Sequence, residues 1–80
     1  MRITIVRPDN LVCVDGFCFS DIDMSSIPPD IVAVQWYDTF GEIESMLPTG
    51  RPSNTPIVSM DPYQDVISQW VTKKAAHDAQ

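Results

Sequence analysis

The chain has 80 residues, a formal net charge of −6 and a sequence pI near 4.2. This length corresponds to one domain, and a hydrophobic content of 44% is too high for a disordered chain. The acidity argues against a nucleic-acid backbone or an anionic membrane as a partner. Its simplest interpretation is solubility, and the sharper one is an acidic face that binds a basic partner.

No run of about 18 apolar residues is present that would span a membrane. The opening segment, MRITIVRPDN, lacks the long apolar core and the small-residue cleavage site of a secretory signal. We therefore expect synthesis and folding in a reducing cytoplasm.

Three short runs rich in β-branched and aromatic residues open the chain and predict three strands, over residues 2–6, 11–14 and 17–20. Turn residues separate them at 7–10 and at Asp15-Gly16, a dipeptide typical of tight hairpins. The two turn lengths give a register that places six apolar side chains on one face: Ile3, Ile5, Val12, Val14, Phe17 and Phe19. The opposite face is mixed, as a sheet covered on one side requires.

The stretch IVAVQWYDTFGEIE, at residues 31–44, has the pattern of a second hairpin that continues to residue 47. A turn at 38–41 would place Trp36 across from Ile43 and would give Gly41 a position that favours positive φ. Tyr37 would then lie on the face opposite to Trp36, and Phe40 would lie at the tip of the turn.

The remaining segments predict two connections and a helix. Residues 20–30 are expected to be a connection anchored on the apolar face by Ile22, Met24 and Ile27. Residues 48–60 are expected to be a Pro-rich loop, exposed and mobile over 48–56, with a short edge strand or an extended lead-in at 57–59.

A C-terminal helix is predicted over residues 61–76, with Asp61 as N-cap, Pro62 in the first turn and Gln64 reaching back to the cap. Its apolar stripe is read as the lid of the core, and the alternative is a partner-binding face: Tyr63, Val66, Ile67, Trp70 and Val71. The residues after the helix are expected to fray. The fold class is thus α+β: one domain, 1–80, in which an antiparallel sheet of about five strands, built from hairpins over 2–47, carries one helix on its apolar face.

Cys13 and Cys18 fall opposite each other across the Asp15-Gly16 turn, as a non-hydrogen-bonded pair close enough for a disulfide. A reducing cytoplasm favours two free thiols, which is our expectation for this cross-strand pair. With only His77 besides, they do not supply the four ligands of structural zinc. We expect no metal and no cofactor.

No catalytic signature is present. Several carboxylates fall in turns, and Glu42 and Glu44 have the spacing of a solvent-facing strand, so paired acid–base catalysis is not indicated. His77 would need to reach Cys13 or Cys18, with a third orienting group, to form a nucleophilic pair. The glycines are isolated turn residues that form no phosphate loop.

Five segments carry a resemblance to a known group: Val14-Asp15-Gly16, Ile27-Pro28, Ala33-Val34-Gln35-Trp36, Gly41-Glu42-Ile43-Glu44 and the helix with Trp70. In these the chain resembles small uncharacterised proteins encoded in the tail-fibre region of tailed, temperate bacteriophages. The resemblance covers most of the chain, and its motifs are structural. It implies a virion tail component or a tail-fibre assembly factor, with no catalytic residue to carry over.

The sequence therefore favours a non-enzymatic phage protein that binds a tail or tail-fibre protein, in the host cytoplasm during assembly or in the virion, with self-association as a further option. The candidate contact residues are Tyr37, Asp38, Phe40, Glu42 and Glu44, because exposed aromatics commonly anchor interfaces. The alternative is a small acidic phage inhibitor of a host defence complex, anti-CRISPR-like, that imitates the charge of DNA. We expect no binding to nucleic acid or membranes.

Overall fold

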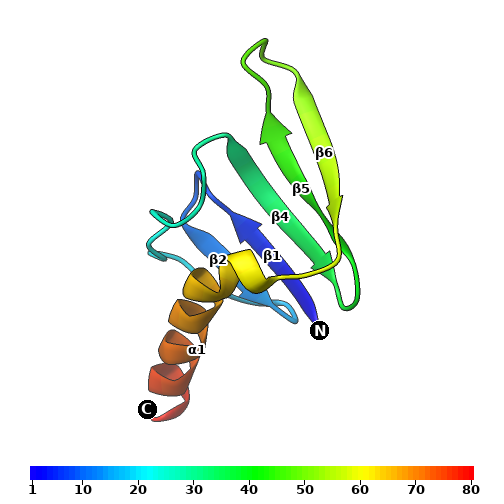
Figure 1. Ribbon diagram of the computed structural model, residues 1–80. Helices are drawn as coiled ribbons and strands as arrows, with labels where there is room; N and C mark the ends of the chain where they lie inside the picture. Colours follow the sequence, from blue (N-terminus) through cyan, green and yellow to red (C-terminus); the bar gives the residue numbers. More distant parts are fainter.

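The computed structural model describes residues 1–80, which form six strands, a 3₁₀ turn and one helix. In chain order these are β1 (Arg2–Val6), β2 (Leu11–Val14), β3 (Phe17–Phe19), β4 (Ile31–Tyr37), β5 (Gly41–Met46), β6 (Pro52–Ile57), η1 (Asp61–Tyr63) and α1 (Gln64–Asp78). All strands pair antiparallel in one sheet of order β3-β2-β1-β4-β5-β6. Figure 1 shows helix α1 near β2 and the β5–β6 hairpin extending away from it. The predicted α+β class is confirmed, with six strands instead of about five.

The predicted register of the first three strands is confirmed. Val14 pairs with Ile3 on one side and with Phe17 on the other. Val12 pairs with Ile5 and Phe19 in the same way. The four aliphatic side chains are buried, while Phe19 packs against the edge of the core and Phe17 is partly exposed. The turn residues alone thus fixed which face of the meander is apolar.

Two segments cover that face. The connection between β3 and β4 buries Ile22, Met24 and Ile27, as predicted from the sequence. The C-terminal segment buries Met60, Tyr63 and Val66, with Ile67 and Trp70 packed against the cluster. The helix is therefore a lid on the core, although Val71 at the end of the predicted stripe is exposed. No helix of this protein is long and apolar enough to cross a membrane.

Side-chain hydrogen bonds fasten the two covering segments to each other and to the sheet. The Gln69 side chain accepts from the Asp23 backbone N–H at 2.8 Å and donates to the Asp23 carbonyl at 2.9 Å. Trp70 Nε1 donates to the carbonyl oxygen of Phe17 at 2.9 Å. One helical turn of α1 therefore holds both the connection and the edge strand β3.

The predicted capping of the helix is wrong in detail. Asp61 does not cap α1 but begins the 3₁₀ turn η1, where its N–H donates to Ser59 Oγ at 3.1 Å. The Gln64 side chain donates to the Met60 carbonyl at 3.2 Å, so it reaches one residue further back than predicted. The helix also ends at Asp78 and not at residue 76. Its last turn is stabilised by the ion pair between Lys74 and Asp78, at 2.7 Å, and by packing of His77 against Phe17.

The turn between β4 and β5 is tighter than predicted. Trp36 pairs with Gly41, and Val34 pairs with Ile43, because Tyr37 N–H donates to the Phe40 carbonyl and closes the loop. The positive φ falls on Asp38, at 96°, and not on Gly41. The shift is by two residues, so each side chain keeps its predicted face.

The predicted Pro-rich loop is wrong over residues 52–57, which form the edge strand β6. Pro52, Asn54 and Pro56 alternate along it, opposite Met46, Glu44 and Glu42 of β5. Proline lacks a backbone N–H, so it fits an edge strand when its nitrogen points away from the neighbouring strand. The Leu47 N–H donates to the Arg51 carbonyl, so the alternation of the ladder turns the backbone of Pro52, Asn54 and Pro56 outward. Of these three residues, only Asn54 has an N–H to donate from the outer edge.

We predict that β6 is protected against strand addition by its prolines. The double substitution Pro52→Val, Pro56→Val restores two outward N–H groups, so we expect concentration-dependent association by light scattering where the wild type shows none. Asn54→Val places the same β-branched side chain on the same face of β6 without adding a backbone donor, and it should behave as the wild type. Equal association of both variants would assign the effect to hydrophobicity and not to the edge.

We predict that Gly41 is required by the close approach of Trp36. A Cβ at this position would overlap the Gln35 carbonyl oxygen and come within 2.9 Å of Trp36 Cε3. Gly41→Ala should lower the free energy of unfolding by about 1–3 kcal/mol, measured by urea denaturation. Ser45→Ala, on the same strand, is the control and should change stability by less than about 0.5 kcal/mol.

Candidate functional site

Exposed apolar side chains gather at the end of the sheet that carries the N-terminus and the β4–β5 turn. The pairing of Arg2 with Tyr37 places Met1 beside that turn, and the pairing of Gly41 with Ile57 places Phe40 beside Val58. We call this group the aromatic end: Met1, Tyr37, Phe40 and Val58. Phe40 is 56% exposed and Val58 83%. Figure 1 shows the N-terminus, the β4–β5 turn and the end of β6 at the same edge of the molecule.

Tyr37 and Phe40 form the centre of the aromatic end. Their ring centroids lie 5.4 Å apart, and the guanidinium of Arg2 lies 4.7 Å from the centroid of the Tyr37 ring. Arg2 also donates to Gln35 Oε1 at 3.2 Å, and Thr4 Oγ1 donates to the same oxygen at 3.0 Å. These contacts hold the Tyr37 ring from one side while its neighbour Phe40 stays open to solvent.

Asp38, at the same turn, binds the amino terminus. The ammonium group of Met1 donates to Asp38 Oδ1 at 2.8 Å, in an ion pair that is exposed on both sides. This hydrogen bond raises the pKa of the amino group above 8.0, the nearby charges of Asp38 and Asp15 act in the same direction, and desolvation opposes them. Asp38 thus ties the N-terminus to the β4–β5 turn.

The face of the sheet opposite the core has no covering segment. By register it presents the following side chains from β1, β4 and β5: Arg2, Thr4, Gln35, Tyr37, Glu42 and Glu44. We call it the uncovered face. Glu42 lies between Gln35 and Pro56, and Glu44 lies between Ala33 and Asn54. The ion pairs of the protein are Met1–Asp38 and Lys74–Asp78, so both glutamates are free for a partner.

The structure brings together the five residues predicted as contacts. Asp38 and Phe40 lie at the turn, and Tyr37, Glu42 and Glu44 share the adjoining uncovered face. Sequence reasoning missed Met1, Arg2 and Val58. Their positions depend on the β1–β4 and β5–β6 pairings. The β5–β6 pairing is not predicted from the sequence, because the prolines of β6 indicate a loop.

Cys13 and Cys18 pair across the β2–β3 hairpin as predicted, with their Cα atoms 4.0 Å apart. The expectation of free thiols is wrong for this structure, because the two sulfurs form a disulfide. A non-hydrogen-bonded pair brings facing residues closer than a hydrogen-bonded pair does, which is the arrangement in which facing cysteines can bond. The bond lies on the same side of the sheet as Thr4, which pairs with Cys13.

His77 lies on helix α1 and not in a frayed tail. Its ring packs against Phe17 and Phe19, with centroids 5.2 and 6.1 Å apart. Lys74 Nζ lies 4.9 Å from the Phe17 ring, and the Trp70 ring packs on Phe19. The C-terminal half of the helix is therefore held by the aromatic side chains of β3, and His77 contributes to this packing.

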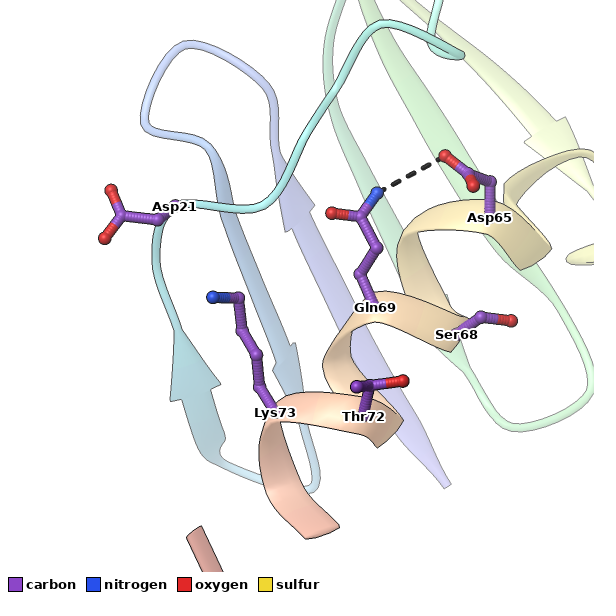
Figure 2. A pocket seen from close by; sticks show the side chains of 6 residues that line it. All are labelled: Asp21, Asp65, Ser68, Gln69, Thr72 and Lys73. Atoms are coloured by element: carbon purple, nitrogen blue, oxygen red, sulfur yellow. Dashed lines mark hydrogen bonds between the residues drawn. The ribbon is translucent and has the colours of Figure 1, made fainter. Parts of the chain in front are cut away.

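A shallow polar groove lies between α1 and the connection after β3. Figure 2 shows the side chains that line it: Asp21, Asp65, Ser68, Gln69, Thr72 and Lys73. Gln69 donates to Asp65 Oδ2 at 3.3 Å, besides its bonds to Asp23, so its amide is engaged in holding the connection. Hydrogen bonds from Ser25 lower the pKa of Asp23, which stabilises this turn with Asp23 ionised. The groove thus marks the place where α1 and the connection after β3 are hydrogen-bonded to each other.

No group of three or more His, Cys, Asp or Glu side chains is arranged to hold a metal ion. No family model matches the chain, and searches of the curated proteins and of the solved structures found no match.

We predict that Asp38 accounts for most of the raised pKa of the amino terminus. Asp38→Asn removes the charge while keeping a residue that tolerates positive φ, so the amino pKa should fall toward 8.0 in an NMR titration of Met1. Because the folded chain favours the protonated amine, this contribution to stability is complete below pH 8.0 and is lost as the pH rises through the folded pKa. Asp9→Asn, in the turn between β1 and β2, should leave the titration unchanged. The same fall in that variant would assign the shift to net charge.

Proposed function

We propose that this protein is a non-enzymatic bacteriophage protein that acts by protein–protein binding, as a structural or assembly component of the tail or tail fibre. The observation that carries the binding role is the exposed Tyr37–Phe40 pair next to an uncovered sheet face. The phage assignment rests on the sequence resemblance described above.

The composition of the aromatic end supports a binding role. Aromatic and arginine side chains are enriched where binding energy concentrates, and here Arg2 lies against the Tyr37 ring beside Phe40. A protein partner would bury Phe40, which the chain itself leaves 56% exposed. Arg2 and Tyr37 are already ordered by Gln35 and by each other, so little conformational entropy is lost on binding.

The charges of the uncovered face favour a partner with basic side chains. Glu42 and Glu44 project from one strand and have no ion pair, whereas Asp38 is neutralised by the amino terminus. Basic groups facing the glutamates would fix the orientation of a partner anchored on Phe40.

The alternative, an acidic inhibitor of a host defence complex, draws on the net charge of −6. It needs carboxylates arrayed along one surface. Asp9 and Asp38 instead lie at opposite ends of the sheet, and Asp78 lies at the end of the helix. This arrangement favours the tail-associated role.

The first test is mass spectrometry of purified particles, followed by capture of co-expressed tail-fibre protein with the tagged chain. Phe40→Ala should weaken capture at least about tenfold, as expected for a central aromatic anchor. Val71→Ala removes an equally exposed apolar side chain from helix α1 and is the matched control, with wild-type capture expected. The variant Glu42→Gln, Glu44→Gln should weaken capture and reduce its dependence on salt.

The proposal fails if the protein is absent from particles and captures no tail or fibre protein. Stoichiometric binding to a basic host nuclease complex, competed by DNA and lost at high salt, would instead establish the inhibitor role. If Phe40→Ala captures the partner as well as the wild type does, the proposed function stands but the contact surface lies elsewhere on the protein.

A further inference from the structure

We propose that Cys13 and Cys18 form a reversible thiol–disulfide site whose oxidation state sets how firmly the end of helix α1 is held on the sheet. The inference is independent of the proposed function. It rests on the disulfide across the β2–β3 hairpin and on the aromatic contacts that attach α1 to β3.

Strand β3 is the shortest strand of the sheet. It has three residues, lies at the edge and pairs only with β2. Its central residue, Cys18, is exposed, and none of its residues is fully buried. A strand with so little burial frays readily unless another bond restrains it. The disulfide supplies that restraint, because it ties the middle of β3 to Cys13 in the neighbouring strand.

The C-terminal half of the helix depends on that same strand. Trp70 donates to the Phe17 carbonyl, His77 packs on both phenylalanines of β3, and Lys74 lies over the Phe17 ring. The first turns of the helix are held differently, by buried Val66 and by the bonds of Gln69 to Asp23. Fraying of β3 would therefore release the helix end while its beginning stays in place.

The site is accessible to a dithiol reductant. Cys18 is exposed and Cys13 is half-buried, so the Cys18 sulfur is the one a thiolate can reach. Attack forms a mixed disulfide on Cys18, and Cys13 leaves as a thiolate that takes up a proton. The second thiol of the reductant then displaces Cys18, so two electrons and two protons pass from the dithiol to the protein and the reductant ends as a cyclic disulfide.

The test compares the protein in buffers of reduced and of oxidised dithiothreitol. Intact mass should fall by about two daltons in the oxidised buffer, one S–S bond replacing two thiols. Hydrogen–deuterium exchange should then be about tenfold faster in residues 70–78 of the reduced form, because local opening is no longer restrained. Exchange in β1 and β4 should be the same in both forms.

Two variants test whether the faster exchange of residues 70–78 arises from loss of the disulfide and passes through β3. Cys13→Ser, Cys18→Ser should exchange like the reduced protein in both buffers, which controls for effects of the buffers themselves. Phe17→Ala removes the ring contacts with His77 and Lys74, so the effect of reduction on residues 70–78 should shrink while its effect on residues 11–19 remains.

The proposal is overturned if no disulfide forms in the oxidised buffer, or if the two forms exchange equally at residues 70–78. It is also overturned if Phe17→Ala leaves the redox effect on the helix end undiminished, since β3 would then not be the link.

Discussion

The rest of this structure depends on one constraint, which is that a sheet with one apolar face must be covered by a chain of only 80 residues. The side chains of Ile5, Val12 and Val34 are completely buried, and they belong to three adjacent strands. Water is excluded from them by the connection after β3 and by a single helix. No segment of residues 1–80 covers the opposite face, so the burial of one side of the sheet leaves the other available for a partner.

The two segments that cover the apolar face, the connection after β3 and helix α1, stay in place because each is bonded to the other or to the sheet. A short helix gains little stability from its own hydrogen bonds and depends on packing. Gln69 joins it to the connection through both backbone groups of Asp23, and Trp70 joins it to β3 through the Phe17 carbonyl. Loss of either attachment would expose part of the same core. This interdependence explains how a change at the edge strand can reach the helix although the two are far apart in sequence.

The sequence predicted most of this fold because tight turns set the register of their own hairpin. Asp15-Gly16 was sufficient to pair Val14 with Phe17 and Cys13 with Cys18. The turn predicted at 38–41 is two residues too long, because Trp36 pairs with Gly41 and not with Ile43, and the faces are nevertheless correct. Strand β6 was missed because Pro52 and Pro56 exclude a central strand but not an edge strand, and position in a sheet is a non-local property. The candidate contacts Tyr37 and Phe40 belong to one local hairpin and could be predicted, whereas Met1 and Val58 are placed by pairings between strands that the sequence does not reveal. The cysteine pairing followed from geometry, but its oxidation state is set by chemistry that turn residues do not encode.

The strand order also separates the two proposed features. The disulfide joins β2 to β3 at one edge of the sheet, whereas Glu42 and Glu44 project from β5 near the other edge, with β1 and β4 between them. The aromatic end lies at the ends of β1, β4, β5 and β6, and its contacts with Arg2, Gln35 and Asp38 involve no residue of β3 or α1. Reduction of the disulfide therefore acts on the covered face at the β3 edge, while the surface proposed for a partner lies on the opposite face and toward the other edge. A one-layer sheet allows this separation, because each edge strand is held by a single neighbouring strand and transmits little of its motion to the strands beyond it.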